Sequence, residues 1–486
     1  MLAVLKTSVL VTYSIVISLL SIYVFHALLM VILYRRTKRK TTESKPGMDQ
    51  YPFVTVQLPV YNEKYVVERL IDSVCRIDYP KERLEIQVLD DSTDETTEIA
   101  HAVSAKYTRL GYDIKLIHRD DRMGYKAGAL RNGLERCKGE FIAIFDADFI
   151  PPVNFLNETL PHFRDAKVGA IQGRWSHLND NYSFLTRGQA LGLDAHFVIE
   201  QTARSRSGTF INFNGTGGIW RKEAILDAGN WQYDTLTEDL DLSYRAQLRG
   251  WNLLYLNDVV CCGEIPTEIN SLKTQQHRWA KGAIQTAKKL LPRVLRADIS
   301  RLAKFEAFVH LTNHVAYPLM LGITLCSVPL IVIKVNCEDA RSYFNWVTLF
   351  TICAFGHPLF YSYAQRELHK DWSRRLLYLP ALFAWGLGTS VTNTKAILEG
   401  LLNIESPFTR TPKYRIERKG DTWQDKIYRS KPPLTTGIEF ALAFYTSAGV
   451  IYSVVHLQFL IVPFLILLSF SFFYTGFLSV FHAVRR

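Results

Sequence analysis

The chain has 486 residues, of which 48% are hydrophobic and 21% charged, and its formal net charge is +11. It is too apolar for a disordered protein and too charged for one that lies in a membrane throughout. Its mean hydropathy of +0.01 averages two unlike parts. Residues 50–300 lack the long apolar runs that occur at 7–34, 311–333, 344–364, 440–456 and 459–481. These features exclude a purely soluble protein and a compact transporter with only short loops.

The positive charge lies mainly beside the apolar runs and not in one basic domain. The flanking cations are Arg35, Arg36, Lys38, Arg39, Lys40, Arg374, Arg375, Arg485 and Arg486. Such flanks are typical of cytoplasmic loops and of contact with anionic lipid, so we expect a lipid bilayer and no nucleic acid as a partner. The seven cysteines form no Cys-x-x-Cys pair, which favours a reducing compartment for the polar insertion.

The first apolar run, 7–34, contains no acidic or basic charge apart from a histidine. It is long enough to cross ~30 Å of hydrocarbon. It also exceeds the ~7–15 apolar residues of a signal peptide, and no small-residue cleavage site separates it from the basic stretch that follows. We therefore expect an N-terminal transmembrane helix, with its C-terminal end in the cytoplasm, and not a cleaved signal.

Residues 50–280 alternate between short apolar strands and helical stretches. The predicted strands are 53–60, 86–89, 114–118 and 141–145. This alternation indicates an α/β domain with a mostly parallel sheet, whose ligands lie beyond the carboxyl ends of the strands. Asp90 and Asp91 follow the second predicted strand, and Asp146 and Asp148 follow the fourth.

The rest of the chain is predicted to be helical and associated with the membrane. We expect a basic amphipathic helix in the interface at 281–304 and two transmembrane helices within 311–364. Interfacial or re-entrant helices with a loop follow at 376–430, and two C-terminal transmembrane helices at 440–483. Within 376–402, Lys395 and Glu399 would each cost ~2.5–3.5 kcal/mol at the bilayer centre. We therefore expect five spans, with the N-terminus outside and the C-terminus inside.

Four clusters carry side chains suited to phosphate and hydroxyl chemistry, namely Asp90-Asp91, Asp146-Ala-Asp148, Glu238-Asp239 and Gln275-x-x-Arg278-Trp279. Two carboxylates at a strand end suit Mg²⁺ or Mn²⁺, which fills its other positions with phosphate oxygens and water. A further carboxylate can accept a proton from an attacking hydroxyl. Arg278 can hold a diphosphate in bidentate fashion, and Trp279 offers a flat apolar face to a sugar ring.

Seven motifs occur in a fixed order: Pro59-Val-Tyr-Asn-Glu63, Gln87-Val-Leu-Asp-Asp-Ser-Thr-Asp94, Gly124-Tyr-Lys-Ala-Gly128, Phe145-Asp-Ala-Asp148, Phe213-Asn-Gly-Thr216, Thr237-Glu-Asp239 and Gln275-x-x-Arg-Trp279. With them the chain resembles the processive, membrane-embedded family-two glycosyltransferases. These include cellulose synthase catalytic subunits and, more closely, the cellulose-synthase-like mannan and glucan synthases. The resemblance covers residues 50–430. It implies an α/β GT-A (Rossmann-like) glycosyltransferase domain inserted between transmembrane helices, with an α-helical membrane bundle.

The resemblance also implies a role for each matching residue. Asp239 would be the general base for the acceptor hydroxyl. Asp146 and Asp148 would hold the metal and diphosphate, with Asp148 as the direct ligand. The nucleotide and its diphosphate would contact Tyr61, Glu63, Asp90 or Asp91, Lys126, Asp146, Gln275 and Arg278. The acceptor would contact Phe213, Asn214, Gly215, Thr216, Glu238 and Trp279.

A later motif, Phe408-Thr-Arg-Thr411-Pro-Lys413, is similar to the Phe-x-x-Thr-x-Lys pattern of the family's gating loop. That loop lies over the donor site, so Phe408, Thr411 and Lys413 are expected near the nucleotide sugar. The motif departs from the cellulose synthase form at Arg410, where that form carries Val. A basic linker beside the membrane is the alternative interpretation.

We predict an inverting, metal-dependent hexosyltransferase of the cell membrane, with a cytoplasmic catalytic domain, that extends a β-glucan or β-mannan chain and translocates it. UDP-glucose and GDP-mannose both stay open as donors, and so does the oligomeric state. The alternatives are a non-processive lipid glycosyltransferase of the ceramide glucosyltransferase type and an inactive membrane scaffold. Because the chain ends soon after the last apolar run, we expect no PilZ domain of the kind that binds cyclic-di-GMP.

Three other patterns are not assigned to the catalytic set. Gln172-Gly-Arg-Trp175 is similar to Gln-x-x-Arg-Trp but lacks one spacer residue, so we interpret it as structural. His310 and His314 are one helical turn apart without a third ligand, which does not favour a metal site. For His196, packing and contact with the acceptor are both open.

Overall fold

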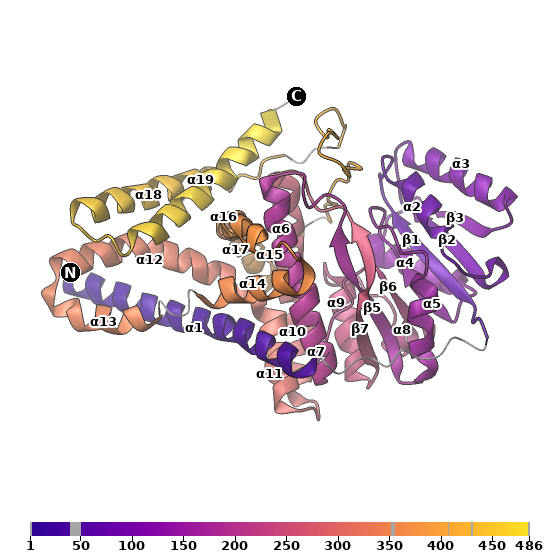
Figure 1. Ribbon diagram of the computed structural model, residues 1–486, viewed down its shortest axis with the longest axis horizontal. Coiled ribbons are helices and arrows are strands. Elements are labelled where there is room, and N and C mark those ends of the chain that lie inside the picture. The colour runs from indigo at the N-terminus through magenta and orange to yellow at the C-terminus, as the bar shows by residue number, and fades with distance from the viewer. Residues whose placement is uncertain (1, 39–49, 351–354, 407, 429–430, 485–486) are drawn as a thin grey trace.

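The computed structural model describes the chain except residues 1, 39–49, 351–354, 407, 429–430 and 485–486. A sheet with its covering helices lies at one end of the molecule, and a bundle of long helices lies at the other (Figure 1). The predicted architecture, an α/β domain between candidate membrane helices, is confirmed. The basic residues Arg39, Lys40, Arg485 and Arg486 lie outside the described residues.

Seven strands form one mixed sheet in the order β3-β2-β1-β4-β6-β5-β7. Strands β1 to β4 pair in parallel, β6 is antiparallel to β4 and β5, and β5 is parallel to β7. All strands except β6 therefore end at the same edge. Their bounds are β1 (Val54–Val60), β2 (Leu84–Asp90), β3 (Asp113–His118), β4 (Phe141–Ile144), β5 (Val168–His177), β6 (Gly218–Arg221) and β7 (Asn252–Gly263).

The central strands are buried on both faces, which is why they read as nearly continuous apolar runs. Their few polar side chains pair with one another across neighbouring strands. Thr55 Oγ1 donates to Glu85 Oε2 at 2.7 Å, and Gln57 Nε2 donates to Gln87 Oε1 at 3.0 Å. Such pairing avoids the cost of leaving buried polar groups unsatisfied.

Helices cover both faces of the sheet and bury a separate apolar core on each. Helices α2, α3 and α5 pack on one face, and α4, α8 and α9 pack on the other. The helices of this domain are α2 (Val67–Val74), α3 (Thr96–Arg109), α4 (Tyr125–Arg136), α5 (Phe155–Thr159), α6 (Phe184–Ala195), the π-helix η3 (His196–Gln201), α7 (Thr202–Ser207), α8 (Lys222–Asp227) and α9 (Glu238–Leu248).

The remaining helices form the bundle, apart from α10, which also packs on the α/β domain. They are α1 (Leu2–Thr37), α10 (Ile269–Arg296), α11 (Arg301–Thr312), α12 (Ala316–Asn336), α13 (Arg341–Leu349), α14 (Gly356–Leu368), α15 (Trp372–Arg375), α16 (Leu379–Gly388), α17 (Ser390–Leu401), α18 (Thr436–Val455) and α19 (Val462–Val484). In the described chain, four stretches are long and apolar enough to cross a membrane: Ala3–Thr37, Arg301–Asn336, Thr436–Val455 and Val462–Val484. The protein is therefore a membrane protein.

The helix expected at 281–304 has different bounds in the structure. Helix α10 begins at Ile269 and ends at Arg296. A separate helix begins at Arg301, where the Ser300 hydroxyl caps it by accepting from the Ala303 amide. The apolar face of α10 packs on α9, α11 and α17, so protein covers the face that the sequence pattern offered to lipid. A basic amphipathic pattern does not distinguish these two environments.

The segment 376–402 forms two short helices, α16 and α17, which are separated at Thr389. Neither is long enough to span a membrane, and their interfacial placement stays a prediction. The expected span 344–364 includes residues 351–354, which lie outside the described residues. That span therefore also stays a prediction.

Helix α10 is joined to the C-terminal helices by a buried ion pair. Lys273 Nζ lies 2.7 Å from Glu439 Oε2 on α18 and 2.5 Å from Ser479 Oγ on α19. The Lys273 and Glu439 side chains are 1% and 0% exposed. Breaking such a pair leaves an uncompensated buried charge, which is strongly destabilising.

We therefore expect Lys273→Met to destabilise the packing of α18 and α19 on α10, by about 3–5 kcal/mol. Thermal unfolding of the protein in detergent micelles measures this as a lower transition temperature. The double variant Lys273→Met/Glu439→Gln should recover much of the loss, because the unpaired charge is gone. Lys395→Met is the matched control, since Lys395 is 59% exposed. A double variant no more stable than Lys273→Met would contradict the role of the pair.

Candidate active site

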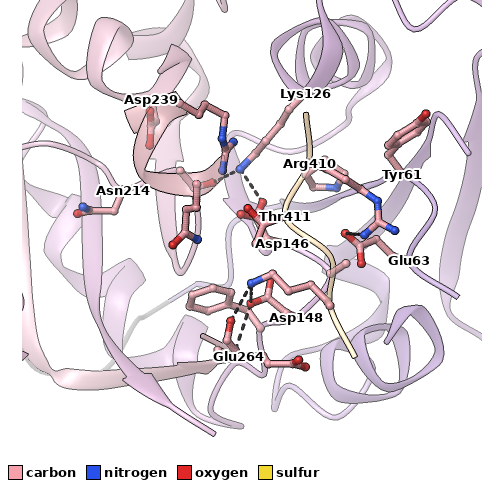
Figure 2. Close-up of a pocket in the computed structure, with 18 of the residues that line it drawn as sticks. Tyr61, Glu63, Lys126, Asp146, Asp148, Asn214, Asp239, Glu264, Arg410 and Thr411 are labelled. Atoms are coloured by element: carbon pink, nitrogen blue, oxygen red, sulfur yellow. Dashed lines mark hydrogen bonds and ion pairs between the residues drawn. The ribbon is translucent and has the colours of Figure 1, made fainter. Parts of the chain in front are cut away.

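The carboxyl edge of the sheet opens into a cleft of about 1270 Å³, counting its open mouth. Carboxylates and cationic side chains, Arg410 among them, meet there, and Thr411 lies in the same pocket (Figure 2). The predicted site residues that line the cleft are Tyr61, Glu63, Asp91, Lys126, Asp146, Asp148, Asn214, Gly215, Glu238, Asp239, Gln275, Arg278, Trp279, Phe408, Thr411 and Lys413.

Asp90 does not line the cleft. It ends β2, is fully buried and accepts hydrogen bonds from the Ser92 amide and the Thr97 hydroxyl, at 3.0 and 2.7 Å. Its Oδ2 also contacts His118 Nδ1 at 2.8 Å. Of the two candidates for the nucleotide contact, only Asp91 faces the cleft, because successive side chains at a strand end point in opposite directions.

Phe213 and Thr216 also lie behind the cleft wall. Phe213 is 1% exposed and packs against Trp220, with the ring centroids 5.6 Å apart. The Thr216 hydroxyl accepts from the Asp146 amide at 2.8 Å. Their expected contact with the acceptor is therefore corrected to a supporting position, because they hold the loops on which Asn214, Gly215 and Asp146 lie.

Two arginines that the sequence analysis missed shape the end of the cleft near Tyr61. Arg119 donates to both carboxylate oxygens of Asp91, at 2.7 and 2.5 Å. The Arg122 guanidinium lies 3.3 Å from the centroid of the Tyr61 ring, which is a cation–π contact. Both arginines lie within five residues before the Gly124 motif, so proximity in sequence to a recognised motif was the available signal.

Lys126 forms an ion pair with the Asp146 carboxylate in the same cleft. Its Nζ donates to Asp146 Oδ1 at 2.5 Å and to the Gly215 carbonyl at 2.9 Å, and lies 3.9 Å from Glu238 Oε1. Burial lowers the pKa of Lys126, but the charges of Asp146 and Glu238 outweigh it and hold the pKa above its ordinary value. Lys126 therefore stays cationic.

Lys413 forms the corresponding ion pair with the Asp148 carboxylate. Its Nζ donates to Asp148 Oδ2 and to the Glu264 carbonyl, both at 2.7 Å. Glu264, which was not predicted, accepts from the Tyr414 amide at 2.9 Å. Its place directly after β7 was the available signal. These contacts bring the gating-like motif onto the cleft.

Glu63 and Arg410 form a buried pair beside them. Arg410 Nη1 lies 3.2 Å from Glu63 Oε1, and the two side chains are 14% and 11% exposed. Burial raises the pKa of Glu63 to about 8, although Arg410 opposes the shift. Arg410, the position at which the motif departs from its cellulose synthase form, is thus the ion-pair partner of Glu63.

Asp239 lies in the first turn of α9 and lines the cleft. Burial and the neighbouring Glu238 raise its pKa to about 7, against the opposing charge of Lys126. Its Oδ1 accepts from the Leu240 amide at 2.9 Å. A carboxyl group with this pKa can exchange a proton with a bound hydroxyl near neutral pH.

Helix α10 contributes Gln275, Arg278 and Trp279 to the cleft. The Arg278 guanidinium lies 4.7 Å from the centroid of the Phe408 ring. Its Nε is buried without a hydrogen-bond partner among the described residues. Phe408 also stacks on Tyr125, with the centroids 5.3 Å apart. Arg278 therefore has donor capacity left for an anion.

Gln172 is structural, as its spacing indicated. Its Nε2 donates to the Gly173, Thr216 and Gly217 carbonyls, and its Oε1 accepts from the Asn214 amide. Trp175 of the same motif lines the cleft as well, which the sequence analysis did not predict. Its Nε1 donates to the Thr216 carbonyl at 3.0 Å.

A buried polar chain connects the first candidate span to Asn214. His26 contacts Glu306 at 2.9 Å, Arg204 lies 3.7 Å from Glu306 and 3.3 Å from Glu200, and Glu200 contacts His196 at 2.9 Å. His196 Nε2 lies 3.2 Å from Asn214 Nδ2. His196 therefore orients a residue of the cleft, while His310 bonds to the Tyr244 hydroxyl at 2.8 Å.

The carboxylates Asp146 and Asp148 fit a hard divalent cation. Each already contacts an ammonium group, Lys126 and Lys413, so the position demands positive charge. No group of three or more His, Cys, Asp or Glu side chains within the described part of the chain could hold a metal ion. A cation here would take its other ligands from phosphate and water, as Mg²⁺ does.

Comparison of the sequence with known proteins agrees with these features. Residues 52–282 match the sequence model of the family described as "Glycosyltransferase like family 2". Glucomannan 4-β-mannosyltransferase 1 of Cyamopsis tetragonoloba is 35% identical over 396 residues, which cover 77% of this chain and 72% of that protein. Glucomannan 4-β-mannosyltransferase 7 of Arabidopsis thaliana is 41% identical over 257 residues, which cover 52% of this chain and only 46% of that protein.

Among solved structures, the chain is similar to the mannosyltransferase PcManGT of Pyrobaculum calidifontis, determined in complex with GDP-Man and Mn²⁺. The two superpose with a TM-score of 0.56 at 20% identity, over 81% of this chain and 100% of that chain. This likeness shows a common fold.

Gly215 lets the Asn214 loop approach Asp239 closely. Its φ is +81°, and a Cβ there would lie 2.9 Å from Asp239 Oδ2 and 3.3 Å from Lys126 Nζ. Gly215→Ala should displace Asp239, and a shift of about 1 Å can cost about 10²-fold in rate. The measurement is the rate of sugar transfer in membranes, at matched protein amounts.

Gly208→Ala is the matched control. Gly208 has a φ of +73°, but a Cβ there meets nothing within 4 Å. The two variants share the backbone strain of a left-handed residue, about 1–2 kcal/mol, and differ in contact with the cleft. Equal losses of transfer rate in the two variants would show that Gly215 matters only for folding.

Proposed function

This chain belongs to glycosyltransferase family 2, and we propose that it transfers mannose from GDP-mannose to the end of a growing β-linked polysaccharide. The observation that carries the proposal is the convergence of Asp146, Asp148, Asp239 and Arg278 in one cleft, on a domain joined to four candidate membrane spans. The transfer inverts the anomeric centre, and the product passes through the membrane helices.

The names of the curated relatives support mannose as the sugar, since both are glucomannan 4-β-mannosyltransferases. GDP-mannose is accordingly the proposed donor, in preference to UDP-glucose. The nucleotide lies at the end of the cleft with Tyr61 and Asp91, where Arg119 and Arg122 supply positive charge. Because the chain spans only part of each relative, the activity of the whole relative enters here as a proposal.

Asp146 and Asp148 would hold Mg²⁺ or Mn²⁺ together with the donor diphosphate. The bound cation would stabilise the negative charge of the leaving GDP. Mn²⁺ accompanies GDP-Man in the Pyrobaculum calidifontis protein of the same fold. Gln275 and Arg278 contact the same diphosphate, and Arg278 suits it because its planar guanidinium can donate two parallel hydrogen bonds.

Asp239 acts as the general base. The acceptor hydroxyl attacks the anomeric carbon of mannose, its proton passes to the Asp239 carboxylate, and the bond to GDP breaks on the opposite side. An inverting displacement of this kind needs one base and a stabilised leaving group, and no enzyme nucleophile. Trp279 stacks on the terminal sugar, and Asn214 and Glu238 contact its hydroxyl groups.

The segment 408–416, which follows α17, supports a catalytic domain that lies beside the membrane on its cytoplasmic side. Lys413 contacts Asp148 at 2.7 Å, so this segment and the catalytic domain lie on the same side of the membrane. We propose that this side is the cytoplasm, where nucleotide sugars are made. A lipid glycosyltransferase of the ceramide type is the second candidate, because it can share the carboxylates and the Gln-x-x-Arg-Trp element.

The test is incubation of membranes containing the protein with radiolabelled GDP-mannose or UDP-glucose, each with and without EDTA. We expect label from GDP-mannose in an ethanol-insoluble polymer that β-mannanase digests. EDTA should abolish incorporation, and Mn²⁺ or Mg²⁺ should restore it. Label recovered only in a chloroform-soluble, single-sugar product would contradict the polymerase proposal and favour the lipid glycosyltransferase.

Asp239→Asn should lower the transfer rate by about 10²–10⁴-fold and leave GDP binding nearly intact, since Asp239 does not contact the diphosphate. The wild-type rate should rise as pH rises through about 7, because the carboxylate that accepts the proton forms there. The measurements are initial rates against pH and GDP affinity by calorimetry. A variant that keeps more than about a tenth of the rate would exclude Asp239 as the base.

Glu238→Gln is the companion variant. Since the charge of Glu238 raises the pKa of Asp239, its removal should move the rise in rate to lower pH. The midpoint of the pH profile reports this shift even if the maximal rate falls. An unchanged midpoint would mean that another group controls the profile.

A further inference from the structure

A second hollow, of about 920 Å³ counting its open side, lies outside the catalytic cleft. The first turns of α6 form one wall, and α15 with the residues that follow it forms the other. Its lining includes three arginines, Arg187, Arg374 and Arg375, and one carboxylate, Asp371. The proposed sugar transfer uses none of these residues.

The charges of this hollow are only partly neutralised. Arg375 already forms ion pairs, because it lies 3.2 Å from Asp180 and 3.6 Å from Asp371. Arg187 and Arg374 form no ion pair with any residue that the structure describes. The Arg187 guanidinium is oriented by the Tyr378 ring, whose centroid lies 4.3 Å away. Two guanidinium groups with free donors thus share one opening.

The hollow lies at the level where a membrane span ends. Helix α14 packs along α1, and Glu367 near its end contacts Tyr34 at 3.1 Å and Lys38 at 2.9 Å. The apolar span Ala3–Thr37 ends at these residues. Since α15 follows α14 directly, its arginines lie near the same level, where headgroups meet the hydrocarbon.

Apolar side chains stand exposed beside the arginines. Leu377, which lines the hollow, is 74% exposed, and Phe184 at the start of α6 is 39% exposed. The Phe184 ring lies 6.2 Å from the Tyr378 ring. A free anion would leave these apolar side chains exposed to water, whereas the acyl chains of a lipid would cover them.

We propose that this hollow binds the phosphate of an anionic phospholipid, with Arg187 and Arg374 donating to the phosphate oxygens and the acyl chains covering Leu377. Guanidinium groups bind phosphate with bidentate geometry, and arginine clusters beside the end of a membrane span suit anionic headgroups. The excess of arginine over carboxylate disfavours zwitterionic lipids, whose headgroups carry a cation of their own.

The test compares lipid retention by purified protein in detergent after incubation with equal amounts of phosphatidylglycerol and phosphatidylcholine. Native mass spectrometry counts each bound lipid. The wild type should retain phosphatidylglycerol preferentially, and Arg187→Gln/Arg374→Gln should lose about tenfold or more of that preference. Arg374→Gln alone should lose part of it, and because Arg374 is exposed, folding is not at risk.

Arg301→Gln is the matched control, since Arg301 is an exposed arginine at the start of another candidate span and lies outside the hollow. It should retain phosphatidylglycerol like the wild type. Inorganic phosphate at millimolar concentration should not displace the lipid. Equal retention by the wild type and the double variant, or displacement by inorganic phosphate, would overturn the proposal, the latter in favour of a free-anion site.

Discussion

Negative charge buried at the carboxyl edge of the sheet is the constraint on which the catalytic half of this protein depends. Several strands end there, and each delivers a carboxylate to a partly dehydrated cleft, where an unpaired charge is costly. Four of them form ion pairs with cations from other elements of the chain, namely Asp91–Arg119, Asp146–Lys126, Asp148–Lys413 and Glu63–Arg410. The loops around the cleft are thus held by the same charges that would bind a nucleotide diphosphate.

Asp239 differs from these carboxylates because no described cation forms an ion pair with it. The charge of Lys126 opposes the effect of burial but does not cancel it, so the pKa of Asp239 lies near 7. The same cleft therefore contains carboxyl groups that form ion pairs and one, Asp239, that forms none with a described cation and can exchange a proton near neutral pH. Environment, and not residue type, separates the proposed binding groups from the proposed base.

Membrane helices reach this cleft by three buried polar connections. Helix α10 presents Arg278 to the cleft and is tied to the C-terminal helices through Lys273. The chain from His26 to His196 ends at Asn214. The segment that follows α17 brings Lys413 to Asp148. Because polar contacts of this kind are directional, movement of a membrane helix would change the geometry around the donor and the acceptor.

The sequence alone determined the local elements and the motif chemistry. Apolar runs located the first strands and four of the five expected spans as candidate membrane helices, and strand ends placed Asp146 and Asp148 at one edge, because these features depend on neighbours in sequence. Only the tertiary structure decided which of Asp90 and Asp91 faces the cleft and that Phe213 and Thr216 lie behind it. It also decided that Arg122 and Glu264 line the cleft and that Arg119 binds Asp91. Those outcomes depend on strand register and on charge pairs between residues far apart in the chain, which no local pattern records.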